Sequence, residues 1–297
     1  MNEILEKATE ILKWIPLCDR CLGRVFSTYG KNLSNKMRGA AIKTLLTMKI
    51  KDIISELSEE ELKRFALNIK FKPFILTLNE LKGLNSNLNE EPKCFICGDR
   101  LDYIIEHFSK QILKEVVNYE FNTFLIGVHA PKGILRKEEE LTAKFKIESY
   151  ESIKNEIKRE IGKVVKDKVG KPPEFMDPDI VFEIDLTRNS LVVHPKPIFI
   201  SGRYVKVGRR ISQVKWLIWK DGRQVRKYRI SIEDSIKPLA EVFKGEEAIL
   251  HAAGREDVDV RMLGKGRPMI VEIRTVSYTH LRAHETEADL VCRLLLE

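Results

Sequence analysis

Two cysteine pairs with identical spacing constrain this chain more than any other feature of its sequence. Cys18 and Cys21 form the first Cys-x-x-Cys motif, and Cys94 and Cys97 form the second. Each motif sits in a tight turn that lets both sulfurs reach one ion, and four thiolates favour zinc in a closed tetrahedron. A closed site has no open position for water, so we predict a structural ion that joins two distant segments. The alternative is two unrelated pairs, one of them redox-active.

The N-terminus and the apolar runs indicate where such a protein resides. Residues 1–13 carry Glu3, Glu6 and Glu10 among apolar positions, which is the pattern of an amphipathic helix rather than a signal peptide. The longest apolar runs, such as residues 121–128, are too short to span a bilayer. We therefore expect a cytoplasmic protein with no membrane segment, whose reduced cysteines bind metal instead of forming disulfides.

The positive charge is concentrated in one stretch. The chain has a net charge of +8, and residues 203–229 contain ten basic residues and one acid, Asp221. Phosphates are the natural partners of such a stretch because each contact releases a condensed counterion. The sequence thus predicts an RNA-binding surface, although a solvated basic face is the alternative. The candidate RNA-binding residues are Arg203, Lys206, Arg209, Arg210 and Lys215.

Hydrophobic periodicity and capping signals predict an α+β fold. Ser58 with Glu61 three residues later is a capping-box pattern that starts one of the helices. Residues 80–93 are rich in Asn, Gly, Pro and Glu and predict a loop. We expect helices over residues 3–14, 34–48, 58–68, 100–117, 149–168 and 231–243, and strands over 121–129, 181–186, 191–193, 198–207, 248–252 and 269–273.

A glycine-containing loop between the last two predicted strands carries the candidate catalytic group. Residues 251–266 read HAAGREDVDVRMLGKG, so Arg255 and Asp257 closely follow Gly254. Such a loop can direct an arginine at a phosphate or a flipped base and place a carboxylate beside the sugar. Spacing alone is weak evidence, because a Gly-x-x-Asp turn also occurs by chance in many proteins.

The extended motif carries a more specific signal. Residues 254–264 and the following Gly266, Arg267 and Pro268 closely resemble the catalytic motif of archaeal-type tRNA pseudouridine synthases of the Pus Ten family. The paired Cys-x-x-Cys motifs match the zinc site of that family's accessory region. Residues 178–216 resemble a THUMP domain, an RNA-binding module of tRNA-modifying enzymes. The resemblance covers nearly all of residues 1–274.

The resemblance implies an enzyme that converts uridines 54 and 55 in the T-arm of tRNA to pseudouridine. Asp257 matches the catalytic aspartate, and Arg255 would contact the RNA backbone or fill the vacated stack. Zinc would be structural, and no cofactor would enter the reaction. The implied organisation is a helical zinc-binding accessory region (residues 1–118), a THUMP-like domain (119–215) and the N-terminal part of a catalytic domain (216–275).

The C-terminal segment looks foreign to the rest of the chain. Residues 276–297 resemble a translated sequencing adapter, and engineered segments are excluded from fold reasoning. That exclusion removes Cys292, His280 and His284 from any site. The catalytic domain is then expected to be incomplete, lacking a tyrosine that stacks on the target base, and we expect the chain to bind zinc and tRNA weakly without measurable activity.

Two other functions fit parts of the same pattern. A THUMP-containing methyltransferase or thiouridine synthase would need a Gly-x-Gly or Ser-Gly-Gly cofactor loop, and neither occurs before residue 275. A zinc-stabilised tRNA-binding module without catalysis is the other alternative. Its protein partners cannot be inferred from the sequence.

Overall fold

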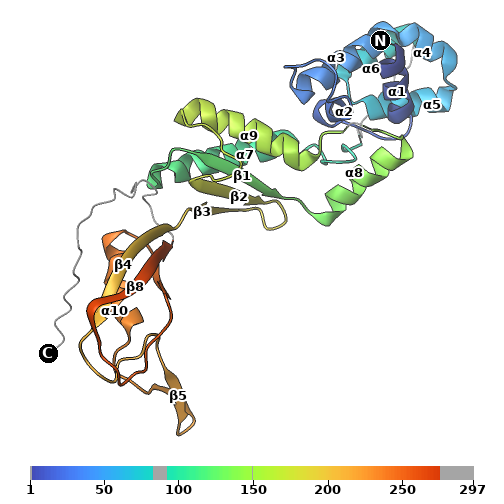
Figure 1. The fold of residues 1–297 in the computed structure, drawn as a ribbon. Coiled ribbons are helices and arrows are strands. Elements are labelled where there is room, and N and C mark those ends of the chain that lie inside the picture. The colour runs from blue at the N-terminus through green and yellow to red at the C-terminus, as the bar shows by residue number, and fades with distance from the viewer. Residues whose placement is uncertain (1, 83–91, 149, 275–297) are drawn as a thin grey trace. The chain divides into compact units, whose positions relative to one another are not determined.

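The computed structural model describes residues 2–82, 92–148 and 150–274, which form a mixed α/β fold. It divides into two compact units (Figure 1). The first contains residues 1–110, 128–163 and 184–190, and the second contains the remaining residues. Among the described residues, no helix is long and apolar enough to cross a membrane.

Six helices begin the first unit. Ser34 caps α3 by accepting a hydrogen bond from the Met37 amide, and Ser58 and Glu61 form a reciprocal capping box on α5. Their apolar faces bury a core that includes Leu12, Phe65 and Phe74. The helices are α1 (Asn2–Leu12), α2 (Asp19–Val25), α3 (Asn35–Met48), α4 (Ile50–Glu56), α5 (Glu59–Ile69) and α6 (Lys72–Lys82).

Helices α2 and α3 approach so closely that their contact requires glycine. A Cβ atom on Gly23 would lie 1.9 Å from the carbonyl oxygen of Asn35. A Cβ atom on Gly39 would lie 1.9 Å from the carbonyl oxygen of Asp19. Each helix therefore packs backbone against backbone, and this fixes the position of the first cysteine motif relative to α3.

The middle of the chain contains long helices and a three-stranded sheet in the order β1-β2-β3. Helix α9 buries Ile153, Ile157, Ile161 and Val165 along one face, as the four-residue spacing of these side chains requires. The elements are α7 (Leu101–Glu115), the 3-10 turn η1 (Val116–Asn118), β1 (Phe124–His129), α8 (Lys132–Lys144), α9 (Ile153–Val169), β2 (Ile180–Asp185) and β3 (Ser190–Pro195).

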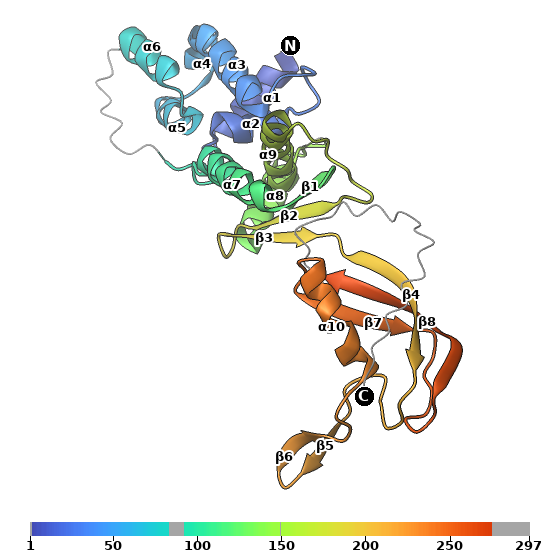
Figure 2. The same ribbon diagram turned by 90° about the vertical axis from the view of Figure 1, so that its left-hand side faces the viewer.

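A second antiparallel sheet, in the order β4-β8-β7, lies within the second unit. Helix α10 (Ile232–Val242) covers one of its faces, as Figure 2 shows, and Ile236 and Ala240 pack against Val271 and Ile273 there. The strands are β4 (Ile198–Lys206), β7 (Glu247–Ala252) and β8 (Met262–Arg274). The connection between β7 and β8, residues 253–261, holds most of the predicted catalytic motif.

A two-stranded hairpin, β5 (Leu217–Lys220) and β6 (Arg223–Arg226), precedes α10. Asp221 and Gly222 form its turn with φ values of 51° and 73°, which is the mirror-image geometry that matches strand twist. All eight strand residues are exposed. Arg226 anchors the hairpin to the start of α10 through two hydrogen bonds of 2.9 and 3.1 Å to the Asp234 carboxylate.

The sequence-based elements are largely confirmed, with four differences. The predicted turn at Cys18 to Cys21 is helix α2, and β8 begins at Met262, well before the predicted position 269. Helices α4, α6 and α8 and the hairpin were missed, because their apolar positions are too few or too exposed for a clear period. Most of the predicted loop at residues 80–93 lies outside the described residues, although α6 extends to Lys82.

We expect Gly39→Ala to lower the thermal stability of the first unit strongly. The added methyl group must displace backbone rather than a flexible side chain, which costs at least about 2 kcal/mol. Gly162→Ala is the matched control, because a Cβ atom there meets nothing within 4 Å inside α9. That change should stabilise the helix by about 0.5–1 kcal/mol. Thermal unfolding followed by far-ultraviolet circular dichroism measures both, and equal midpoints would contradict the close packing.

Candidate metal centre and catalytic loop

The four predicted ligands converge in the first unit. The sulfur atoms of Cys18, Cys21, Cys94 and Cys97 all lie within 4.8 Å of one another, and none is in a disulfide. The Cys18 and Cys97 sulfurs are 3.6 Å apart. Ideal tetrahedral zinc, with Zn–S bonds of about 2.3 Å, places its sulfurs about 3.8 Å apart. The donor set and its spacing therefore fit one tetrahedral ion.

Local backbone geometry positions each pair. Cys18 is the N-cap residue of α2 and Cys21 lies in its first turn, where the helix dipole favours thiolates. In the second pair, the Gly98 amide donates to the Cys94 carbonyl at 2.8 Å, and Gly98 has a φ of 58°. The Phe95 amide donates to the Pro16 carbonyl at 2.8 Å, which joins the two motifs directly.

Crowding makes the four thiols unequal. The hydrogen bond with Cys18 raises the pKa of Cys21, and burial adds to this effect. Hydrogen bonds from Cys18 and Cys21 lower the pKa of Cys94. Thiols bind a metal as thiolates, so a divalent cation at this cluster would displace the protons that the sulfurs carry.

A buried arginine adjoins the metal centre. Arg24 is fully buried, and its guanidinium donates to the Cys21 sulfur at 3.2 Å. The same guanidinium pairs with Glu138 of α8 and lies 3.3 Å from the Glu156 carboxylate of α9. Burial raises the pKa of Glu156, although the charges of Arg24 and Arg20 oppose this. The sequence analysis did not identify Arg24. The available signal was its position, three residues after Cys21 on a short helix.

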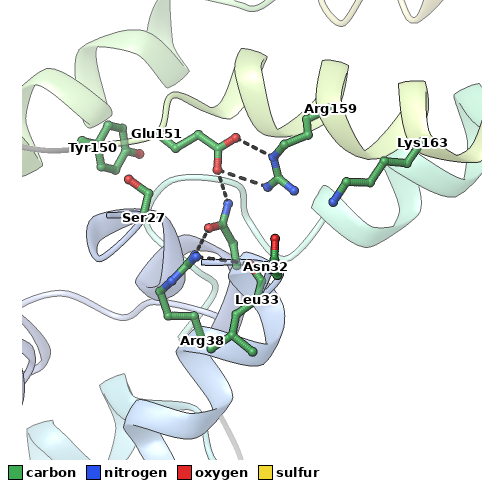
Figure 3. A pocket seen from close by; sticks show the side chains of 9 residues that line it. Ser27, Asn32, Leu33, Arg38, Tyr150, Glu151, Arg159 and Lys163 are labelled. Atoms are coloured by element: carbon green, nitrogen blue, oxygen red, sulfur yellow. Dashed lines mark hydrogen bonds and ion pairs between the residues drawn. The ribbon is translucent and has the colours of Figure 1, made fainter. Parts of the chain in front are cut away.

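The first unit also contains a polar pocket of about 510 Å³, lined by residues of the segment 27–38 and by Tyr150, Glu151, Arg159 and Lys163. Figure 3 shows Glu151 facing Arg159, which donates to it at 2.9 and 3.1 Å. The Asn35 amide also donates to Glu151, at 2.6 Å. Arg38 donates to four backbone carbonyls and to the Asn35 side chain. Because these groups already have protein partners, we assign the pocket no ligand.

The predicted catalytic loop lies between β7 and β8 in the second unit, with the side chains of Arg255 and Asp257 exposed. Gly254 has a φ of 81°, which permits the turn that begins the loop. The Arg210 amide donates to the Val258 carbonyl at 3.0 Å, so the structure brings the basic stretch against this loop. Asp257 therefore projects from a backbone that is fixed on both sides.

The nearly buried carboxylate of Glu256 stabilises the loop from the protein side. It accepts a hydrogen bond from the Tyr204 hydroxyl at 2.9 Å and pairs with Arg267 at 3.1 Å and Lys206 at 3.4 Å. Burial alone would raise the pKa of Glu256, but the Tyr204 hydrogen bond and the Lys206 charge outweigh it and lower the pKa. Gln213 donates to the Gly254 carbonyl at 2.7 Å. Sequence reasoning missed these supporting residues.

Lys206 differs from the other predicted RNA-binding residues because its side chain is buried. We predicted it to bind RNA, but it is 2% exposed. Its ammonium donates to the carbonyl oxygens of Asp257 at 2.9 Å and Ile211 at 3.3 Å. The structure therefore corrects its role, because alternation along β4 turns this lysine inward. It supports the loop instead of facing solvent.

The other predicted RNA-binding residues remain at the surface. Arg203 is exposed, although it donates to the Lys265 and Gly266 carbonyls at 2.6 and 3.1 Å. Arg209, Arg210 and Lys215 are exposed, and so is Trp219 of the hairpin at 73%. Exposed cations and exposed aromatic rings are the groups that bind nucleic-acid strands.

Comparison with known families supports this geometry. The profile of the archaeal Pus10 THUMP domain matches residues 108–185, and that of the Pus10 C-terminal region matches residues 199–290. These spans differ from the predicted domains 119–215 and 216–275. The second match includes part of residues 276–297, which lie outside the described residues and whose foreign origin stays a prediction.

Curated relatives named tRNA pseudouridine synthase Pus10 are similar along most of the chain. The protein from Ignisphaera aggregans is 38% identical over 91% of this chain and 62% of its own length. That from Thermofilum pendens is 39% identical over 91% of this chain and 60% of its own length. The Pyrobaculum arsenaticum protein is 33% identical over 97% of this chain and 68% of its own length. The chain thus spans about three fifths of the first two relatives.

We expect the purified chain to retain one divalent metal ion that depends on the cysteine cluster. Cys18→Ser should abolish stoichiometric metal and lower the thermal midpoint, because a structural ion contributes directly to folding. Cys292→Ser is the matched control, since this fifth cysteine belongs to no Cys-x-x-Cys motif. Elemental analysis after dialysis measures the metal content. Unchanged content in Cys18→Ser would rule out the site.

We also expect Lys206→Met and Arg209→Met to affect different properties. Lys206→Met leaves Glu256 without one buried partner, so hydrogen exchange in residues 254–261 should become faster. Arg209→Met should leave that exchange unchanged and reduce the salt dependence of RNA binding, by about 0.7–0.9 in the log–log slope if it meets one phosphate. A smaller salt slope for Lys206→Met without faster exchange would show that its predicted phosphate contact was right.

Proposed function

The chain belongs to the Pus10 family of tRNA pseudouridine synthases, and we propose that it performs their reaction with Asp257 as the catalytic aspartate. The observation that carries the proposal is the exposed Asp257 carboxylate on a loop whose backbone is held by Lys206 at 2.9 Å. A reactive carboxylate needs such fixed positioning while it stays accessible to a flipped nucleotide.

The chemistry is an isomerisation within one nucleotide. The bond between C1′ of the ribose and N1 of uracil breaks, the base rotates, and a bond forms between C1′ and C5. The proton leaves C5 and N1 gains one, so no redox partner or organic cofactor is required. Asp257 would start the cleavage, either as a nucleophile at the sugar or as a base that removes a proton from it. Arg255, beside it on the loop, would contact the RNA backbone or fill the vacated stack.

We propose uridines 54 and 55 of the tRNA T-arm as the targets and the cytoplasm as the location. RNA would lie along the exposed basic residues of the second unit, namely Arg203, Arg209, Arg210 and Lys215, and along the β5–β6 hairpin. The exposed charges and the exposed Trp219 support this placement.

We further propose that zinc occupies the cysteine cluster as a structural ion. Four thiolates at near-tetrahedral spacing match zinc better than harder cations, which prefer oxygen ligands. The proposed organisation remains an accessory region over residues 1–118, a THUMP-like domain over 119–215 and a catalytic part over 216–275. A zinc-stabilised tRNA-binding module without catalysis is the alternative, favoured if the 297-residue chain binds tRNA without modifying it.

The test is nucleotide-resolution mapping of pseudouridine in unmodified tRNA. The protein should modify positions 54 and 55, and Asp257→Ala should reduce the rate at least about a thousandfold, as removal of an essential catalytic group does. Asp167→Asn, an exposed change on α9, is the control and should be neutral.

Binding of tRNA without measurable conversion would instead favour the alternative, a binding module without catalysis. Unchanged activity after Asp257→Ala would overturn the catalytic assignment.

A further inference from the structure

A tryptophan in the first unit is exposed although its neighbours are buried. Trp14 follows α1 and is 57% exposed, whereas Ile11, Leu12 and Ile15 are at most 6% exposed. The helical core is therefore complete without this ring. A large exposed aromatic side chain outside the core is typical of a contact surface.

Two cations from separate elements converge on the Trp14 ring. The Arg64 guanidinium carbon of α5 lies 5.4 Å from the ring centroid, and the Lys144 ammonium of α8 lies 5.2 Å from it. Trp14 is still 57% exposed, so the two cations leave much of its ring open. We call these three residues the Trp14 surface.

Among the described residues, the cations of the Trp14 surface lack close ion-pair partners, although the hydrogen bonds from Ser58 and the charge of Arg64 together lower the pKa of Glu61. Within the described ranges, no carboxylate forms an ion pair with Arg64 or Lys144. Glu61 is near Arg64 in sequence, but its carboxylate caps α5 by accepting from the Ser58 hydroxyl at 2.8 Å and amide at 3.0 Å. The two cations are thus available to an anionic ligand.

A second lysine of α8 also lies over an aromatic ring. The Lys137 ammonium lies 5.3 Å from the ring centroid of Phe95, between the second pair of cysteines. Lys137 and Lys144 are seven residues apart (144 − 137), which is two helical turns and about 10 Å on one face. One helix therefore carries two lysines, each over an aromatic ring, although exposed Glu140 lies on the same helix.

We propose that the Trp14 surface binds an unpaired nucleotide of the RNA substrate, with its base against Trp14 and its phosphate between Arg64 and Lys144. Aromatic rings stack on bases of any sequence, and cations beside them hold the phosphate. Bases within a duplex have both faces covered, so the occupant is a single-stranded segment. This inference rests on the proposed tRNA substrate, but it concerns binding by the first unit and not the reaction.

The test compares RNA affinities of full-length, metal-loaded variants. The probes are a 12-nucleotide single-stranded RNA, its duplex and an unmodified tRNA transcript. Trp14→Ala should weaken single-strand and tRNA binding by about fivefold or more, the usual effect of losing one stacked base. Duplex binding should stay within twofold. The combined change Arg64→Gln and Lys144→Gln should lower the salt slope by about 0.7 for each cation that meets a phosphate.

Leu76→Ala is the matched control, since Leu76 is 52% exposed on α6 and should have no effect. Trp14→Phe keeps an aromatic ring and should retain most of the RNA affinity. If Trp14→Ala does not fold, the affinity of Trp14→Phe tests the proposal instead. Unchanged binding in Trp14→Ala, as a protein-docking role predicts, overturns the proposal. So does an equal loss in Trp14→Phe and Trp14→Ala. The Trp14 surface is tested by binding and Asp257 by conversion, so failure of catalysis and failure of the Trp14 surface give different results.

Discussion

The buried guanidinium of Arg24 is the interaction on which the first unit depends. It donates to the Cys21 sulfur, pairs with Glu138 and lies beside Glu156, which Arg20 also contacts at 3.0 Å. Glu138 also accepts from the Tyr150 hydroxyl and the Ile153 amide, each at 2.8 Å. Burying so many charges is costly unless every member is paired. The cysteine cluster, α8 and α9 are therefore coupled, because loss of Arg24 leaves Glu138 buried without its charged partner.

The sequence predicted those parts of the fold that have local signals. Cysteine spacing identified the four cysteines that converge in the cluster, and the Ser58–Glu61 box marked the start of α5. Helix α8 was not predictable in this way, because most of its residues are charged and few are buried. Arg24 and Glu138 were also not predictable, since their pairing joins residues 114 positions apart, and no periodicity reports such a contact.

The candidate catalytic loop shows the same limit. Its motif was recognisable, and Asp257 is exposed as a reactive group must be. Its support was not, because Tyr204 and Lys206 come from β4, far from the loop in sequence. Lys206 also shows why charge counts overstate a binding surface: within a basic stretch, the inward-facing member of an alternating strand serves the protein itself.

The position of the loop between two adjacent strands has a consequence for how the protein folds. Strands β7 and β8 pair antiparallel, and the pair nearest the loop is Ala252 with Met269. This pairing joins residues that are close in sequence, so its contact order is low. Strand β4 pairs with β8 across a much longer separation, and only then does Lys206 reach the Asp257 carbonyl. The β7–β8 pairing is thus expected to form early, with its loop not yet fixed. The geometry needed for catalysis is acquired in a late, non-local step.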